Sequence, residues 1–106
     1  MNEQLALSTP TESLCALIVS DRLHGVDVQL VIDAIIDAAA ANNGIVDANL
    51  VRPHIHHSVF PKVIGAVYNV LIRKGALVPT GDWSISNDTA GRNSGRPVRR
   101  YRLELP

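Results

Sequence analysis

The segment from residue 61 to 75 is bounded at both ends by residues that limit a helix. Pro61 suits the first helical position, where its missing N–H is not needed, and Gly75 suits the turn that ends a helix. Apolar side chains recur between them at helical spacing and form one stripe: Val63, Ile64, Val67, Tyr68 and Leu71. The opposite face holds small and polar residues, namely Lys62, Gly65, Ala66, Asn69 and Arg73. The sequence therefore predicts a helix with one buried face and one face that can approach another surface closely.

Two further helices are predicted upstream. Thr9 as N-cap, Pro10 and Glu12 form a helix start, so a helix should run from Pro10 to about residue 23 and end at Gly25. Its apolar stripe consists of Leu14, Leu17 and Ile18. The run VQLVIDAIIDAAAANN, residues 28–43, predicts a second helix with Asp27 as N-cap and Gly44 at its end.

A short helix is predicted between these and the helix at 61–74. Ile45 and Val46 are expected to form a short strand, and Asp47 is placed to cap a helix over 48–53. Pro53 shortens or kinks this helix because it cannot donate the interior hydrogen bond. The run PHIHHSVF, residues 53–60, then predicts a loop.

The C-terminal third has the pattern of short strands. The runs ALV, DWSIS and VRRYRLEL are expected to be strands, and a loop rich in Gly, Asn and Arg separates the last two. In the last run Tyr101, Leu103 and Leu105 alternate with charged residues, which predicts one buried and one charged face. Trp83 and Ile85 are expected to supply the matching apolar face of the preceding strand.

The chain has the size and composition of one globular domain. Its 106 residues suffice for a single core, and 46% of them are hydrophobic while 19% are charged. No apolar run reaches the roughly 18 residues that a membrane span requires, and the N-terminus lacks the pattern of a signal peptide. The single cysteine, Cys15, lies in an apolar run and is expected to be a core residue. We therefore expect a cytoplasmic protein that does not enter a membrane.

A net charge of zero conceals a strong asymmetry along the chain. Residues 1–50 hold one basic and seven acidic residues, a net charge of −6, and residues 51–106 hold nine basic and three acidic residues, a net charge of +6. Such asymmetry indicates a surface for a polyanion, with the acidic half facing elsewhere. The alternative is that the two halves attract each other within the fold.

Catalytic and metal-binding patterns find little support. His54, His56 and His57 lie close together, but a protein zinc site needs three or four ligands and no Cys pair or further His stands at a supporting spacing. Contact with phosphate or packing in the turn is the alternative for these histidines. Asp33 and Asp37 are interpreted as a solvated acidic helix face. In the absence of a phosphate loop or nucleophile motif, we expect no enzyme, no cofactor and no bound metal.

Three stretches resemble a known family. VDANLVRPHI, PKVIGAVYNVLIRKGAL and GRPVRRYRL are similar to parts of small actinobacterial and bacteriophage DNA-binding proteins of the winged helix-turn-helix class. Phe60 departs from that pattern, which commonly has a histidine there, and the connection at 53–60 is longer than in a simple helix-turn-helix. The resemblance implies an α+β fold, with residues 26–106 as the winged domain, 61–74 as the recognition helix and 83–105 as the wing. Residues 1–25 are then an N-terminal tail and an extra helix.

The resemblance implies a double-stranded DNA-binding protein that regulates transcription. Phosphates attract Lys and Arg, and a few side chains read base edges. Asn69 is expected to pair with an adenine edge, Arg73 with a guanine or phosphate, and Lys62 with a phosphate. Gly65 and Ala66 would let the backbone come near or touch a thymine methyl. The arginines expected on the wing are Arg92, Arg96, Arg99, Arg100 and Arg102.

Two questions of partnership remain open at this point. A winged helix can instead be a protein-interaction or assembly module of a nucleoprotein complex, in which the basic wing grips an acidic protein partner. The helix at 10–23 carries more apolar surface than a free helix should expose to water. It must therefore pack on its own core or on a second copy, and a homodimer through residues 10–23 is expected because two-fold symmetry suits adjacent DNA half-sites.

Overall fold

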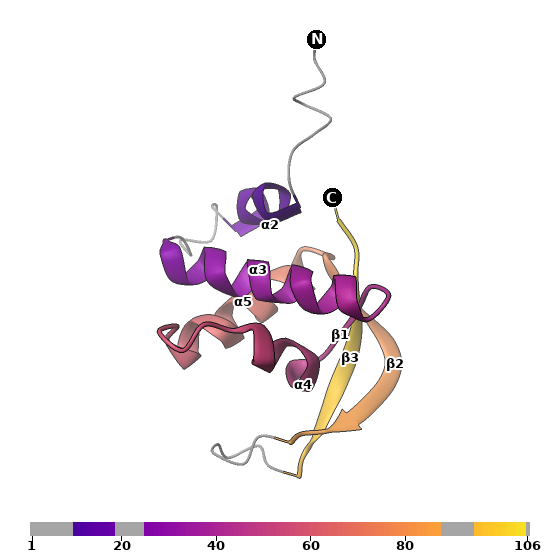
Figure 1. The fold of residues 1–106 in the computed structure, drawn as a ribbon. Helices are drawn as coiled ribbons and strands as arrows, with labels where there is room; N and C mark the ends of the chain where they lie inside the picture. The colour runs from indigo at the N-terminus through magenta and orange to yellow at the C-terminus, as the bar shows by residue number, and fades with distance from the viewer. Residues whose placement is uncertain (1–9, 19–24, 88–94, 106) are drawn as a thin grey trace.

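The computed structural model describes residues 10–18, 25–87 and 95–105. These residues form an α+β arrangement of four α-helices, a 3-10 helix and a three-stranded antiparallel sheet (Figure 1). The elements are α2 (Pro10–Ile18), α3 (Val26–Ala41), β1 (Ile45–Val46), α4 (Ala48–Val51), η2 (Arg52–His54), α5 (Pro61–Arg73), β2 (Leu77–Ile85) and β3 (Pro97–Leu103). Among the described residues, no helix has both the length and the apolar character that a membrane crossing requires.

The helices pack around α3, which has buried residues along most of its length. α2 and α5 both contact α3 and each other, and Figure 1 shows α2 lying across α3. Leu14 of α2 is fully buried in the same core as Ile32 and Ile35 of α3 and Leu71 of α5. The predicted helix from Pro10 is therefore present to Ile18, and at least one residue of its apolar stripe packs on the core of its own chain. Thr9 and residues 19–24 lie outside the described residues.

The start of α3 differs from the prediction. Gly25, with φ of 110°, is the N-cap, and no side chain caps the helix. Asp27 lies in the first turn, and its carboxylate accepts a hydrogen bond of 3.1 Å from the backbone N–H of Phe60. The expectation that Asp27 caps α3 is therefore wrong, because its carboxylate instead joins the start of α3 to the start of α5.

The short elements near residue 47 form as predicted. Ile45 and Val46 are a two-residue strand, and Oδ1 of Asp47 caps α4 by accepting a hydrogen bond of 2.9 Å from the N–H of Leu50. The predicted helix over 48–53 is shorter than expected, since the α-helix ends at Val51 and a 3-10 helix replaces it over Arg52–His54. Pro53 is the reason, because it cannot donate a hydrogen bond within a continuing α-helix.

Both ends of α5 lie where the sequence places them. Pro61 is its first residue and Arg73 its last. Gly75 has φ of 82°, its N–H bonds the carbonyl of Ile72, and the N–H of Ala76 bonds the carbonyl of Leu71. This pair of bonds is the glycine-dependent Schellman ending, which fixes the direction in which the chain leaves α5 toward β2.

The last strand in the chain lies in the middle of the sheet. The order is β1-β3-β2, with Val46 opposite Tyr101 and Leu77 opposite Leu103. The two strands expected at 76–78 and 82–86 are one strand, β2, interrupted by a bulge between Pro79 and Trp83. We call β2 and β3 together the hairpin. Figure 1 shows its far end projecting beyond the helices.

The predicted apolar face of the hairpin is only partly buried. Tyr101 and Leu103 are half-buried and pack against the core, as expected. Trp83 is 54% exposed, Ile85 is 62% exposed, and Leu105 lies beyond the end of β3 and is also exposed. The prediction that Trp83 and Ile85 supply a buried matching face is wrong, because no other part of the described chain packs closely enough to cover these two side chains.

Candidate functional site

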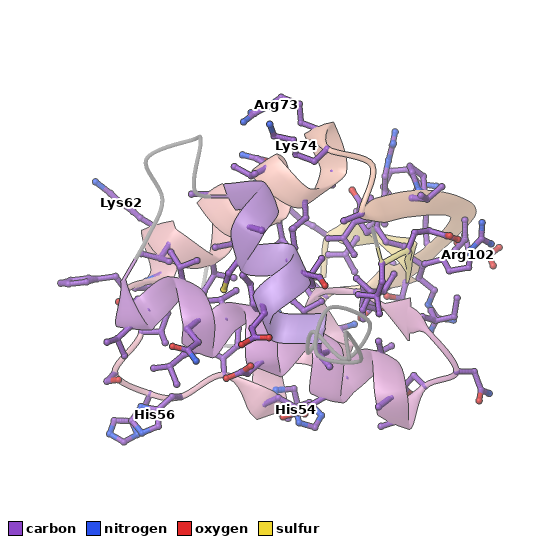
Figure 2. All side chains as sticks on the ribbon, turned by 90° about the horizontal axis from the view of Figure 1, so that it is seen from above. His54, His56, Lys62, Arg73, Lys74 and Arg102 are labelled. Carbon is purple, nitrogen blue, oxygen red and sulfur yellow. The ribbon has the colours of Figure 1, made fainter. Side chains whose placement is uncertain are left out.

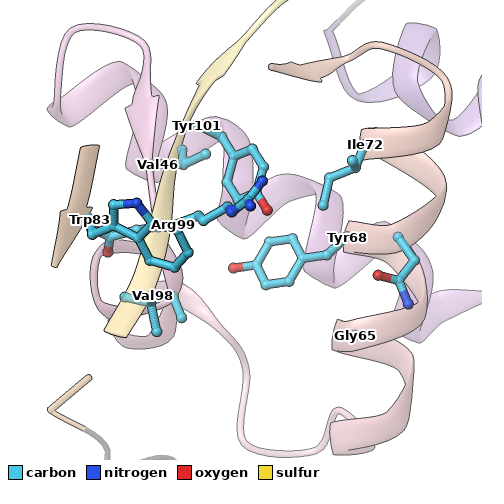
Figure 3. Close-up of a pocket in the computed structure, with 11 residues that line it drawn as sticks. Val46, Gly65, Tyr68, Ile72, Trp83, Val98, Arg99 and Tyr101 are labelled. Carbon is cyan, nitrogen blue, oxygen red and sulfur yellow. The ribbon is translucent and has the colours of Figure 1, made fainter. Parts of the chain in front are cut away.

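A groove of about 330 Å³ lies between α5 and the hairpin. Most of its lining is apolar or aromatic, from Val46, Tyr68, Ile72, Trp83, Val98 and Tyr101. Asn69 of α5 and Arg99 of β3 add polar groups. Figure 3 shows Tyr68 pointing from α5 toward β3 and Arg99 pointing from β3 toward α5. The groove therefore joins residues that are far apart in the sequence.

Arg99 is placed by the indole of Trp83. The two residues are opposite each other in the hairpin, and the guanidinium carbon lies 5.0 Å from the centre of the indole ring. An arginine at this distance over an indole is held by a cation–π interaction worth roughly 0.5–1 kcal/mol at an exposed site. Within residues 25–87 and 95–105, no carboxylate forms an ion pair with Arg99. Its charge is therefore available to an anion at the groove.

The phenol of Tyr68 in the lining has a raised pKa. Burial raises its pKa, and the nearby carboxylate of Asp47 raises it further. Like any tyrosine hydroxyl it is protonated at neutral pH, so it can donate a hydrogen bond. Among the described residues, none is a hydrogen-bond partner of this hydroxyl.

A second hollow continues the groove along α5. It has a volume of about 380 Å³ and shares Ala48, Gly65 and Tyr68 with the groove. A Cβ atom added at Gly65 would meet no heavy atom within 4 Å. Gly65 therefore leaves open space where it borders the two hollows.

The hairpin is fastened to α4 by Asp47. While Oδ1 caps α4, Oδ2 accepts hydrogen bonds from Oγ of Ser84 at 3.0 Å and from Nε of Arg100 at 3.2 Å. The Asp47 side chain is 1% exposed and the Arg100 side chain 42% exposed. A buried carboxylate needs such partners, because an unpaired charge is costly to bury. We call this set of bonds the Asp47 clip.

A second set of bonds fastens the hairpin to the same helix. Asn49 donates to the carbonyl of Ile85 at 2.7 Å and accepts from the N–H of Asn87 at 3.0 Å. Arg52 donates to the side chains of Asn49 and Asn87. These three residues, Asn49, Arg52 and Asn87, were not predicted, since nothing local in the sequence links positions 35 to 38 residues apart.

The predicted α5 residues lie on one outward stripe. Lys62, Gly65, Asn69 and Arg73 are exposed, and Ala66 beside them is half-buried. Figure 2 shows Lys62 at one end of α5 and Arg73, with Lys74, at the other, all pointing outward. Of this stripe, only Gly65 and Asn69 line the groove.

The predicted hairpin arginines divide into different environments. Arg96 and Arg99 are exposed, and of the four predicted arginines that the structure describes, Arg99 alone lines the groove. Arg100 belongs to the Asp47 clip, and Nε of Arg102 pairs with Glu104 at 2.6 Å on the surface (Figure 2). Arg92 lies outside the described residues. The structure thus brings Gly65, Asn69 and Arg99 together and leaves Arg102 away from the groove.

The histidines do not form a metal site in the part of the chain that the structure describes. The rings of His56 and His57 stack with their centres 4.3 Å apart, and Nδ1 of His56 lies 2.7 Å from Oγ of Ser58. No group of three or more His, Cys, Asp or Glu residues there could hold a metal ion. His54 and His56 point outward from the edge opposite Arg73 (Figure 2).

The thiol of Cys15 is not activated as a nucleophile. Burial raises its pKa, and the charge of Asp33 raises it further, which disfavours the nucleophilic thiolate.

Comparison of the chain with protein-family models, curated proteins and solved structures found no match. What the molecule can bind therefore has to follow from the chemistry of its own surfaces. Those surfaces offer a helix face without acidic residues, an arginine stacked on an indole and an apolar groove between them.

Proposed function

We propose that the chain is a winged-helix protein that binds double-stranded DNA and regulates transcription. In this proposal α5 enters the major groove and the hairpin is the wing that contacts the DNA beside it. The order of elements supports this arrangement, because a short helix, a longer amphipathic helix and an antiparallel hairpin follow one another from residue 48 to 103. The α+β fold and its sheet are compatible with the winged-helix class.

The outward stripe of α5 is the observation that carries the proposal. Lys62, Gly65, Asn69 and Arg73 are spaced by three or four residues, so they share one helical face, and all four are exposed. α5 contains no acidic residue. A helix that is cationic at both ends and has a small residue and an amide between them suits a phosphate-lined groove, where Asn can pair with adenine and Arg with guanine.

The hairpin supports the proposal through the arginines that pair with no carboxylate among the described residues. Arg96 and Arg99 are exposed, and the contact with Trp83 holds Arg99 beside α5 without neutralising its charge. Arg100 and Arg102 are weaker candidates, since each has a carboxylate partner. We therefore assign phosphate contacts on the wing to Arg96 and Arg99 first.

A salt titration of DNA binding tests the proposal. Affinity for random and for genomic duplex DNA is measured by fluorescence anisotropy between about 50 and 200 mM salt, a range over which six to ten phosphate contacts cost roughly 10³–10⁵ in affinity. We expect the logarithm of affinity to fall linearly with the logarithm of salt, with a fraction of genomic sites bound more tightly than random DNA. Absence of measurable binding at the lowest salt would refute the proposal.

A protein-interaction module is the second candidate, and exposed apolar residues favour it. Phe60 is 72% exposed at the start of α5, and Trp83 and Ile85 are exposed on the hairpin. Aromatic side chains of this kind are enriched at protein interfaces. In that case the basic hairpin grips an acidic protein partner, and DNA binding is weak and independent of sequence in the same titration.

A further inference from the structure

The groove between α5 and the hairpin has the properties of a small-molecule site. Its volume of about 330 Å³ lies within the range of roughly 300–1,000 Å³ that is typical of such sites. The lining is mostly apolar, and three of its residues are aromatic, Tyr68, Trp83 and Tyr101. Flat aromatic ligands suit such walls, because ring pairs gain energy from offset or edge-to-face packing beyond the area that they bury.

The polar groups of the lining favour an anionic ligand. Arg99 is the cation of the lining, and among the described residues no carboxylate pairs with it. The carboxylate of Asp47 also borders the groove, but it is almost fully buried and Arg100 pairs with it. The groove therefore presents a cation whose fork of N–H donors matches a carboxylate.

Two further groups can orient such a ligand. The Tyr68 hydroxyl points toward β3 and has no hydrogen-bond partner within the described residues (Figure 3). A tyrosine hydroxyl is protonated at neutral pH, and burial raises the pKa of Tyr68 further, so the hydroxyl can donate to a carboxylate oxygen. The side-chain amide of Asn69 also borders the groove.

We propose that this groove binds a small planar aromatic carboxylate, with its ring between the aromatic side chains and its carboxylate on Arg99 and the Tyr68 hydroxyl. Such a ligand would cover Asn69 and Arg99, which we also assign to DNA. Bound ligand and bound DNA therefore exclude each other, and this second statement rests on the proposed function. The ligand would act as an effector that releases the protein from DNA.

NMR titration in the absence of DNA tests the site. Trp83 is the only tryptophan of the chain, so one indole N–H signal reports directly on the groove. We expect 1-naphthoate to shift this signal in a saturable manner. The neutral 1-naphthamide should bind at least about tenfold more weakly, since it cannot form charge-assisted hydrogen bonds with Arg99. Equal binding of the two compounds, or no shift, would overturn the site.

Two matched arginine variants test whether Arg99 binds the carboxylate of the ligand. Arg99→Gln should weaken 1-naphthoate binding about tenfold or more, and Arg102→Gln, which lies on the same strand but outside the groove, should leave it unchanged. Equal effects of the two variants would show general attraction by positive charge and overturn the assignment. Tighter binding of deoxyadenosine monophosphate than of 1-naphthoate would assign the groove to a nucleotide and also overturn it.

Competition with DNA separates this inference from the proposed function. Saturating 1-naphthoate should lower the affinity for duplex DNA, and saturating 1-naphthamide should not. A ligand that shifts the Trp83 signal while DNA affinity stays unchanged would refute the exclusion. If the protein shows no DNA affinity without ligand, the proposed function fails, and the NMR result alone still decides the site.

Discussion

Replacing Asp47 by Ala should destabilise the fold far more than removal of a surface charge. The change deletes the cap of α4 and the acceptor that Oδ2 provides to Ser84 and Arg100 of the hairpin. Loss of an N-cap typically costs about 1 kcal/mol, and loss of a neutral hydrogen bond another 0.5–1.5 kcal/mol or so. The ion pair adds roughly 1 kcal/mol after allowance for solvent, because the Arg100 side chain is 42% exposed and can be hydrated once freed. The free energy of unfolding should therefore fall by about 3 kcal/mol.

Urea denaturation followed by Trp83 fluorescence measures this loss of stability. A second variant separates the contribution of the Asp47 charge from that of the helix cap. Asp47→Asn keeps an oxygen that can cap α4 but removes the charge, so it should lose only about half as much, since Asn caps as well as Asp. Glu104→Ala is the control, because its pair with Arg102 has both side chains about half exposed and is worth at most ~1 kcal/mol. A loss for Asp47→Ala no larger than that of Glu104→Ala would refute the reasoning that the Asp47 clip holds the hairpin on the helices.

Three further outcomes are expected. Changing Arg96 and Arg99 together to Ala should weaken binding to all DNA sequences alike. The slope of log affinity against log salt concentration should fall in magnitude by about 0.9 for each phosphate that the variant no longer neutralises. An unchanged slope would exclude the hairpin from the DNA interface. Asn69→Ala should reduce discrimination between preferred and random DNA by roughly 1–3 kcal/mol while circular dichroism stays the same; unchanged discrimination would place base reading elsewhere. Light scattering at micromolar concentration should give the mass of a homodimer formed through residues 10–23, although Leu14 packs on its own chain. A measured mass equal to that of one chain would contradict the dimer.

Local signals in the sequence were sufficient for the helix ends and caps near the groove. Pro61 and Gly75 each act within one turn of α5, and Asp47 caps α4 through a residue three positions away. Such features depend on backbone chemistry that neighbouring residues determine, so pattern alone predicts them. The outward stripe of α5 follows for the same reason, because helical spacing places Lys62, Gly65, Asn69 and Arg73 on one face.

Features that depend on distant partners could not be predicted in this way. Asp47 meets Arg100 across 53 residues, and Asp27 meets the N–H of Phe60 across 33, so local capping rules described one role of Asp47 and the wrong role for Asp27. The groove was not predicted either, since it exists only where α5, β2 and β3 meet. Alternation in the hairpin predicted burial of Trp83, but alternation identifies a face without showing whether another element packs closely enough to cover it.

The order of the strands constrains when the fold can form. β3 lies between β1 and β2, although it follows both in the chain, so neither earlier strand has a partner in the sheet until residues 97–103 are available. During synthesis on a ribosome the helices can associate early, because α3 and α5 are complete by residue 73. Closing the sheet must wait for β3 and pairs residue 45 with residue 102, a separation of the kind that slows folding. A ribosome-bound chain that ends before residue 97 should therefore form a helical core and leave β1 and β2 unpaired, with their edges open to aggregation.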